Sequence, residues 1–370
     1  MNAWQAGSAA PAADARLDVL VIGAGQAGLA AGYFLQRAGV KFALIERNER
    51  VGDSWRRRYD SLRLFSPRSY DALPGAVMPG DPEGYPSKDE MAGYLEAYVQ
   101  RFGLPVRAGE GVTRLERGEA GGFAAHTTAR RTVAARAVIA AAGAFQRAVV
   151  PAFAGALAKD VEQFTAQTYR CPAQVKARRV VVIGAGATGR QIARELAPGR
   201  DVWLAGGRAQ TVLPQRVLGR DNLWWLDRAG VVRADKQSVV GRLARARDAF
   251  PGAHLRTRAL RRRGVRVVGR ALGAVGRRFR FAGDAEEEFG AVVWAVGYRD
   301  DASWLRIEGA VGEHGEFLEK RGVSPAAGLF YVGRSWQNNR ASALVCGVGD
   351  DAAKIVARVR RFLANEKRGA

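Results

Sequence analysis

Residues 17–47 read LDVLVIGAGQAGLAAGYFLQRAGVKFALIER, and this stretch decides the fold. Residues 17–22 are an apolar run with β-branched members, which predicts a buried strand. Three glycines follow at 23, 25 and 28, and the apolar spacing after them predicts a helix. A second apolar run, 41–46, predicts another strand. The order strand, glycine turn, helix and strand predicts a βαβ unit.

Each of the three glycines and the acid at the end of the second strand has a physical task. Gly23 allows the tight turn, Gly25 lets the backbone approach a pyrophosphate, and Gly28 lets the helix pack closely on the strand. The N-terminus of the helix then faces the phosphate charge. Glu46 ends the second strand, where a carboxylate can accept hydrogen bonds from a ribose 2′-OH. The unit therefore predicts a site for a dinucleotide with a free ribose.

Residues 177–208, ARRVVVIGAGATGRQIARELAPGRDVWLAGGR, repeat the unit with Gly184, Gly186 and Gly189. Arg208 stands near the position where the first unit has its acid, and arginine can pair with a 2′-phosphate in bidentate fashion. Arg190 adds a positive group beside the third glycine, although ordinary surface arginine is the alternative for both residues. The second unit therefore predicts an NADP(H) site.

Composition narrows the class of protein. The chain has 370 residues, 48% of them hydrophobic, and a formal net charge of +22. The arginine runs are short and scattered, so we favour a positive surface that attracts phosphorylated cofactors and anionic substrates over a specific nucleic-acid partner. A DNA partner or an anionic membrane surface stays open.

The ends and the cysteines give further expectations. No apolar run is long enough for a transmembrane segment, and residues 1–16 are expected to be a disordered tail. Cys171 and Cys346 are far apart and in no metal or redox spacing. We therefore expect a cytoplasmic protein with no metal site and an oligomeric state that the sequence leaves unknown.

The chain resembles the class B flavin-containing monooxygenases, in particular their small bacterial members, from about residue 17 to 360. Besides the glycine loops, residues 51–75 (VGDSWRRRYDSLRLFSPRSYDALPG) resemble the family's segment beside the flavin. Residues 138–145 and 292–305 resemble its two interdomain connectors, and residues 328–359 resemble its closing strand and helix. The resemblance extends to the plant-type indole-pyruvate monooxygenases.

The expected fold class is α/β, with two Rossmann-like dinucleotide-binding domains, the NADP domain inserted in the FAD domain. The boundaries follow from the two buried strands ended by glycine that bracket the second unit. The first part of the FAD-binding domain is expected at 17–145, the NADP-binding domain with its linker at 146–296, and the closing part at 297–370.

The resemblance implies an oxidoreductase with FAD and NADP(H) that oxygenates a small-molecule substrate with O₂ through a C4a-(hydro)peroxyflavin. The chain departs from the family's pattern at two places. Lys159 or Thr165 stands where a linker His is usual, and Phe65 falls about where animal members have Asn. These departures favour N- or S-oxygenation, or oxidation of a 2-oxo acid, over Baeyer–Villiger chemistry. The alternatives are an NADPH-dependent flavin reductase or oxidase without oxygenation, and a non-catalytic FAD-binding redox sensor that regulates a partner.

The chemistry is expected to be centred on the flavin, so no protein residue is assigned a catalytic role. Asp350 is expected at the N-cap of a last helix whose free N–H groups face the flavin. The expected FAD-binding residues are Gly23, Gly25, Gln26, Gly28, Glu46, Arg47, Gly52, Trp55, Leu62 and Asp350. The expected NADP(H)-binding residues are Gly184, Gly186, Thr188, Gly189, Arg190 and Arg208.

Overall fold

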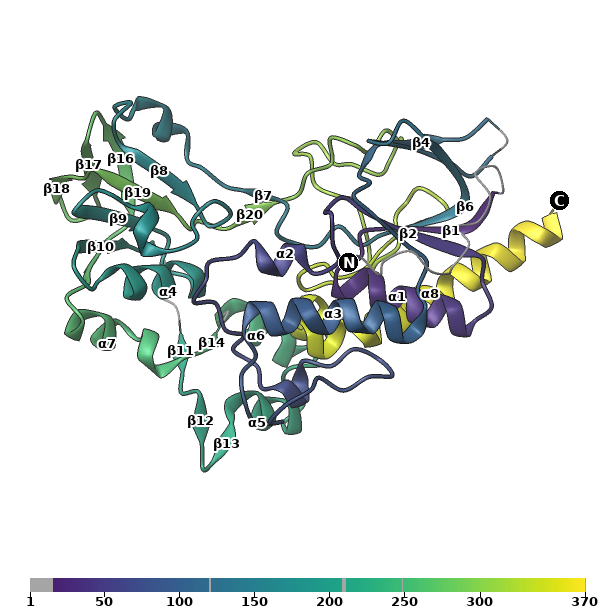
Figure 1. Cartoon of the computed structure of the whole chain (residues 1–370), viewed down its shortest axis with the longest axis horizontal. Helices are drawn as coiled ribbons and strands as arrows, with labels where there is room; N and C mark the ends of the chain where they lie inside the picture. The colour runs from purple at the N-terminus through teal and green to yellow at the C-terminus, as the bar shows by residue number, and fades with distance from the viewer. Residues whose placement is uncertain (1–15, 120, 208–210, 248, 370) are drawn as a thin grey trace, which may run out of the picture.

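The computed structural model describes residues 16–119, 121–207, 211–247 and 249–369. Two lobes, each built on its own sheet, lie side by side, and a third group of small elements lies below them in the view (Figure 1). The expected tail at 1–16 lies outside the described residues except for Arg16, which donates a hydrogen bond to the Gly121 carbonyl at 2.9 Å. That residue therefore belongs to the folded part.

The first lobe contains a seven-stranded sheet in the order β3-β2-β1-β6-β5-β4, with β21 pairing the second half of β6. The strands β3, β2, β1, β6 and β21 pair in parallel. The pairs β6–β5 and β5–β4 are antiparallel. The strands are β1 (Leu17–Ile22), β2 (Phe42–Glu46), β3 (Val106–Ala108), β4 (Val112–Arg117), β5 (Phe123–Thr127), β6 (Thr132–Ala140) and β21 (Leu329–Tyr331).

Both faces of this sheet are buried, which explains the unbroken apolar runs of its parallel strands. One face packs against the helices α1 (Gln26–Arg37), α3 (Lys88–Phe102) and α8 (Val345–Gly369). The other face packs against the segment that contains Leu305 and Phe317. A capping box at Ser87 and Glu90 begins α3, and Gly103 ends it in the left-handed conformation.

The second lobe contains a five-stranded parallel sheet in the order β15-β10-β9-β19-β8. Its core on one face includes residues of α4 (Ala187–Leu196) and α7 (Thr257–Arg262), and on the other face it includes a three-stranded meander. The strands are β8 (Glu162–Thr165), β9 (Arg179–Ile183), β10 (Asp201–Ala205), β15 (Arg266–Val268) and β19 (Ala291–Trp294), and those of the meander are β16 (Ala271–Val275), β17 (Arg278–Phe281) and β18 (Glu286–Glu288).

Two short strands join the lobes. The chain leaves the first sheet after β6 and returns to it at β21, so every strand of the second sheet lies between these two in sequence. On the way out β7 (Arg147–Ala148) pairs antiparallel with β20 (Tyr298–Arg299) on the way back. The pair sits between the lobes (Figure 1); β20 lies within the predicted connector 292–305, whereas β7 follows the predicted connector 138–145.

Residues 211–252 extend from the second lobe and pack against the first. Tyr85 Oη donates to Asp221 Oδ2 at 2.6 Å, and the Lys236 N–H donates to the Asn338 carbonyl at 2.8 Å. The extension comprises β11 (Val212–Leu213), β12 (Arg216–Val217), β13 (Arg220–Asp221), β14 (Phe250–Pro251), α5 (Asn222–Arg228) and α6 (Val239–Arg247). Among the described residues, the remaining helices are α2 (Asp53–Arg56) and five short 3₁₀ turns at Arg68–Tyr70, Ala152–Ala156, Pro172–Gln174, Ala253–Leu255 and Arg340–Ala343.

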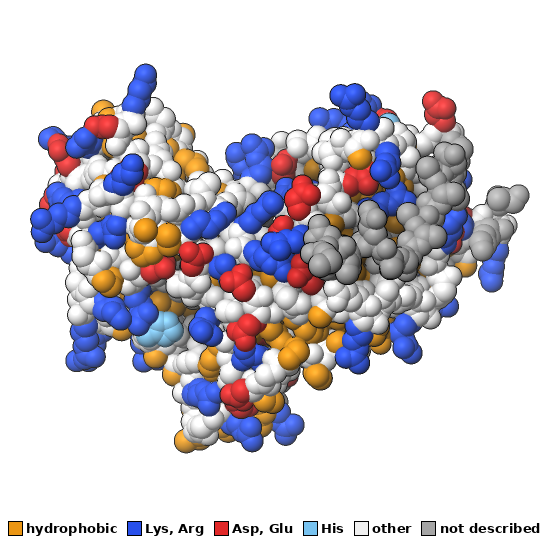
Figure 2. Space-filling view, viewed as in Figure 1, with side chains coloured by type: hydrophobic (Ala, Val, Ile, Leu, Met, Phe, Trp, Pro, Cys, Tyr) orange, Lys and Arg blue, Asp and Glu red, His pale blue; other side chains and the backbone are white. Residues whose placement is uncertain are grey.

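The positive charge is distributed over both lobes. Figure 2 shows Lys and Arg side chains spread across this face, with acidic side chains between them, rather than gathered in one patch. Within the described part of the chain, no helix has the length and apolar character needed to cross a membrane.

Candidate functional site: two glycine loops and the pocket between the lobes

The first glycine loop connects β1 to α1 and has the geometry that the sequence predicts. Gly23 has a φ of +103°, and a Cβ there would lie 2.6 Å from the Ala141 carbonyl oxygen. A Cβ on Gly28 would lie 1.9 Å from the Gly23 carbonyl oxygen, so turn and helix packing both require glycine. A Cβ on Gly25, in contrast, would have no atom within 4 Å. Gly25 therefore faces open space, into which a ligand backbone could approach.

The start of α1 supplies N–H groups to this space. Gly25 is the N-cap residue, and no side chain caps the helix. The first N–H groups of such a helix lack intrahelical acceptors and favour an anion. The loop therefore fits a pyrophosphate in both shape and charge.

Glu46 stands at the end of β2 beside this loop. It is 9% exposed, and its carboxylate accepts from the Ala24 N–H at 2.8 Å. Asn48 donates to the other carboxylate oxygen with its backbone N–H at 3.0 Å and with Nδ2 at 2.6 Å. Three donors thus satisfy a buried charge and fix it at the mouth of the loop. The sequence reasoning missed Asn48, although its position two residues after the strand-end acid is a signal for such a contact.

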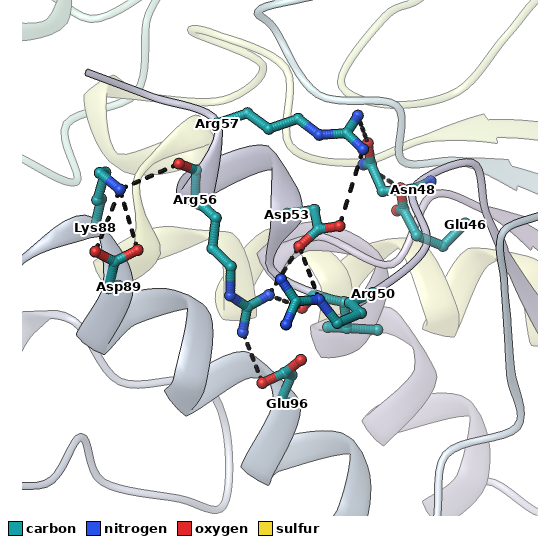
Figure 3. Close-up of polar contacts among 10 residues, drawn as sticks. Glu46, Asn48, Arg50, Asp53, Arg56, Arg57, Lys88, Asp89 and Glu96 are labelled. Carbon is teal, nitrogen blue, oxygen red and sulfur yellow. Dashed lines mark hydrogen bonds and ion pairs between the residues drawn. The ribbon is translucent and has the colours of Figure 1, made fainter. Parts of the chain in front are cut away.

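A polar cluster of buried and exposed side chains connects Glu46 to α2 (Figure 3). Arg57 Nη1 donates to Asn48 Oδ1 at 2.7 Å, and Asp53, which is 6% exposed, accepts from Arg56 Nη1 at 3.0 Å. Arg56 also reaches Glu96 on α3 at 2.6 Å. The arginines of the basic run at 56–58 therefore make contacts with other residues of the protein. Arg47, predicted to bind FAD, is exposed at the edge of this cluster.

Gly52 and Trp55 lie in the segment of α2, close to α3 and to the start of α1 respectively. Gly52 has a φ of +86°, and a Cβ there would lie 2.7 Å from the Ala92 carbonyl oxygen, so glycine lets α2 approach α3. Trp55 packs on the core of the first lobe and donates from Nε1 to Gln26 Oε1 at 3.3 Å. The structure thus brings Trp55 to Gln26 at the start of α1, whereas Gly52 serves the contact between α2 and α3.

The second glycine loop repeats this construction between β9 and α4. Gly184 has a φ of +111°, and a Cβ there would lie 2.3 Å from the Ala295 carbonyl oxygen. A Cβ on Gly189 would lie 1.8 Å from the Gly184 carbonyl oxygen. Gly186 is the N-cap of α4, which again has no side-chain cap, and Thr188 lies partly exposed in its first turn. The second loop therefore also fits a pyrophosphate.

Arg190 does not lie where the sequence reasoning placed it. Its side chain is 5% exposed; Nε donates to the Ala185 carbonyl at 2.8 Å and Nη1 to the Leu255 carbonyl at 2.9 Å. Burial lowers the pKa of its guanidinium. The first turn of α4 directs this side chain into the lobe, where Arg190 supports the loop from behind, and its contact with a 2′-phosphate stays a prediction. Arg208 lies outside the described residues.

Asp350 is not an N-cap residue, which corrects the prediction for the last helix. The helix α8 begins at Val345, and Asp350 lies inside it, half exposed and ion-paired with Arg233. The sequence was misleading because Gly347 and Gly349 look like loop residues. A Cβ at these two positions would lie 2.2 Å from Ala341 Cβ and 2.8 Å from Pro74 Cγ. The glycines serve close helix packing.

Leu62 also has a different environment from the one expected. It is partly buried and packs on the core of the second lobe, in the cluster that includes Tyr59 and Tyr169. Tyr59 Oη donates to Gln191 on α4, and Tyr169 Oη donates to Glu195 at 3.1 Å. The segment after α2 therefore forms part of the contact between the lobes.

A pocket of about 430 Å³ opens at this contact. The first lobe contributes Arg63 and Phe65, which alternate with the inward-facing leucines, and the second lobe contributes Arg194 and Glu195 of α4 and also His254. Burial raises the pKa of Glu195, whereas burial and the nearby Arg194 lower the pKa of His254. The sequence reasoning missed these residues, although the spacing of 191, 194 and 195 after the glycine loop places them on one helix face.

The connectors between the lobes are held by an aromatic clamp. Arg58 Nη1 donates to Tyr298 Oη at 2.8 Å, and its guanidinium lies 5.7 Å from the centre of the Phe145 ring. Tyr298 belongs to β20, and Phe145 precedes β7. The clamp therefore ties the α2 region to both connecting strands.

Comparisons with known proteins agree with this construction. Residues 20–210 match the pyridine nucleotide-disulphide oxidoreductases. An uncharacterized CzcO-like oxidoreductase of Geobacillus kaustophilus is 37% identical over 92% of this chain and 97% of its own length. The chain belongs to this oxidoreductase family, and its resemblance to the flavin-dependent enzymes is confirmed.

Two further relatives have named activities. The indole-3-pyruvate monooxygenase YUCCA8 of Oryza sativa subsp. indica is 28% identical, covering 92% of this chain and 90% of that protein. The solved structure of a flavin-containing monooxygenase from Stenotrophomonas maltophilia has a TM-score of 0.79 and 28% identity, covering 94% of this chain and 99% of that one. Structures that share the fold at lower identity include complexes with FAD and NADP.

The two cysteines do not form the redox pair that disulfide chemistry requires. Both are free thiols; Cys171 lies before the second glycine unit, and Cys346 lies in the first turn of α8. Burial raises the pKa of the Cys346 thiol to about 12, and only the thiolate attacks a disulfide. The family's disulfide reaction therefore has no support among these residues.

Proposed function

We propose that the protein is a flavin-dependent monooxygenase that oxidises NADPH and transfers one oxygen atom of O₂ to a small molecule. The observation that carries this proposal is the pair of glycine loops, each at a helix N-terminus without a side-chain cap and the first with open space at Gly25, on two sheets joined by β7 and β20. FAD, when bound, supplies hydride acceptance and the reaction with O₂.

The first lobe is assigned to FAD. Gly25 leaves room for the pyrophosphate, Glu46 faces the loop as a ribose acceptor would, and Gln26 and Trp55 lie on the same side. The second lobe, residues 146–296, is assigned to NADP(H) as a domain inserted into the FAD domain of 17–145 and 297–370. The support for the insertion is that all strands of the second sheet lie between β6 and β21.

The pocket between the lobes is assigned to the approach of the substrate. It lies where the 61–65 segment meets α4, between the two nucleotide-binding lobes. Its charged lining of Arg63, Arg194, His254 and Glu195 orients a polar molecule. The YUCCA8 relative is named for indole-3-pyruvate, a 2-oxo acid, so 2-oxo acids join amines and thioethers as candidate substrates.

The test is product analysis with purified protein, FAD, NADPH and O₂. Candidate amines, thioethers and 2-oxo acids are supplied singly, and ¹⁸O₂ is used to trace the oxygen. Incorporation of one labelled atom into a product, with one NADPH consumed for each product molecule, supports the monooxygenase. NADPH consumption that ends only in H₂O₂ for every substrate class would favour a reductase or oxidase, and absence of NADPH oxidation would favour a sensor.

A further inference from the structure

The helix α6, Val239–Arg247, presents its apolar side chains to solvent. Val239 is 64% exposed, Val240 is 45% exposed and Leu243 is 52% exposed. These positions, spaced one and four apart, lie on one face of a helix. An ordinary surface helix would turn this face toward the core, so α6 has the reverse orientation.

Specific contacts fix this orientation. Gly241 is buried, and a Cβ there would lie 2.0 Å from the Asp235 carbonyl oxygen, so the glycine side is the inner face. Ser238 Oγ accepts from the Gly241 N–H at 3.0 Å and caps the helix. The preceding turn is anchored to the first lobe by the Lys236 N–H and the Asn338 carbonyl. The apolar side of α6 therefore faces outward as a result of how the helix is held.

Positive charge borders the exposed apolar face. By helical spacing, Arg242 lies beside this face, Arg247 lies one turn after Leu243 at its end, and Arg245 lies on the side away from it; all three are exposed. Residues 236–247 contain no acidic residue. The nearest preceding acid, Asp235, is paired with Arg321 at 2.7 Å. The helix thus combines an exposed apolar stripe with two exposed arginines, Arg242 beside it and Arg247 at its end; the next acid in the sequence, Asp248, follows the helix and lies outside the described residues.

We propose that α6 docks this protein on an anionic membrane surface. An apolar stripe enters the boundary between headgroups and acyl chains, while flanking arginines pair with lipid phosphates and carboxylates. These charges argue for an anionic bilayer over a second copy of the chain, since two copies facing each other through α6 would bring four arginines together and the net charge of each is +22. The attachment is peripheral and independent of the proposed reaction.

The experiment is co-sedimentation of the full chain with vesicles of phosphatidylcholine alone and of equal parts phosphatidylcholine and phosphatidylserine. The wild type is expected to bind only the anionic vesicles. Leu243→Asp is expected to weaken binding about tenfold or more, because the carboxylate is repelled and the apolar contact is lost. Leu272→Asp is the matched control, since Leu272 is 51% exposed on β16 of the second lobe, and it is expected to bind as the wild type does.

A second pair of variants separates the helix from the general charge. Arg242→Gln with Arg247→Gln is expected to weaken binding about 25-fold, about fivefold for each arginine. Arg278→Gln with Arg280→Gln on β17 removes the same charge elsewhere and is expected to have little effect. The proposal is overturned if the wild type fails to bind or binds both vesicle types equally, if both arginine pairs have equal effects, or if Leu243→Asp binds like the wild type. The proposal is also overturned if the wild type binds no vesicles and forms a dimer that Leu243→Asp dissociates, because the apolar face of α6 would then be a dimer interface.

Discussion

Asp71 is a buried carboxyl group that makes the stability of the first lobe depend on pH. It is 1% exposed; Oδ1 accepts from Ser66 Oγ at 2.6 Å, and within the described residues Oδ2 has no hydrogen-bond partner. Burial raises the pKa of Asp71 from 3.8 to about 7, against the opposing effects of Ser66 and Arg68. The native state therefore holds a proton that the unfolded chain has already lost.

The sign and size of the effect follow from this difference. Between about pH 4 and pH 7 the native state binds more protons than the unfolded chain, so the free energy of unfolding falls as the pH rises. The contribution is fully present below the unfolded pKa of 3.8 and is lost as the pH rises through about 7. At about 1.4 kcal/mol for each pKa unit, the loss across this window is about 4 kcal/mol.

Asp71→Asn removes the titration while keeping an oxygen for Ser66. The difference in unfolding free energy between the variant and the wild type should therefore move by about 4 kcal/mol in favour of the variant between pH 4 and pH 7. Urea denaturation at a series of pH values, followed by tryptophan fluorescence, measures this difference. Asp284→Asn, at an exposed position, is the control and should parallel the wild type. Parallel curves for Asp71→Asn and the wild type would refute the reasoning.

Three further variants test the nucleotide sites. Gly25→Ala should weaken FAD binding about ten- to hundredfold, because its Cβ enters the open space and costs a hydrogen bond to a charged phosphate, which is worth about 1.5–3 kcal/mol. Fluorescence titration of the apoprotein with FAD measures this change. Gly93→Ala is the control, because its Cβ also meets nothing within 4 Å. Arg190→Met should destabilise the second lobe by about 2–5 kcal/mol, since it leaves the Ala185 and Leu255 carbonyls without their donor. The variant should also change the KM values for NADPH and NADH equally. A rise in KM confined to NADPH would show that Arg190 contacts the 2′-phosphate. Arg208→Glu should raise the KM for NADPH far more than that for NADH, and equal changes would remove the basis for assigning the 2′-phosphate to Arg208.

The parts of the fold that depend on local sequence were predictable. The glycine loops could be placed because turn, close approach and helix packing fall within one short stretch of chain. Glu46 was predictable for the same reason, since it ends the strand next to the loop. The parallel strands showed themselves as apolar runs because both faces of each sheet are buried.

The predictions that failed depend on tertiary packing. Gly347 and Gly349 suggested a loop before Asp350, yet they lie in α8 because Ala341 and Pro74 leave no room for a side chain. Arg190 follows the third glycine of its unit, but the direction of its side chain is set by acceptors at Ala185 and Leu255. Sequence spacing contains no information on such partners.

The pocket between the lobes was beyond prediction for a related reason. Arg194 and His254 come from segments far apart in the second lobe, and they meet Phe65 of the first lobe only when the lobes dock. The same holds for Arg58, whose ring partners Phe145 and Tyr298 lie on opposite connectors. Hydrophobic periodicity predicts which residues are buried but not which lobe they face.

The central claim is that reduced flavin in this protein transfers oxygen. The direct measurement is anaerobic stopped-flow reduction of the FAD-loaded protein by NADPH or NADH, followed by mixing with O₂ while the flavin spectrum is recorded. The account predicts faster reduction by NADPH than by NADH. Mixing with O₂ should then give a transient spectrum that is neither reduced nor oxidised flavin and that decays faster when a substrate that accepts the oxygen atom is present. Slow or absent reduction by NADPH, or a direct return to oxidised flavin with stoichiometric H₂O₂ in the presence of every substrate class, would contradict it.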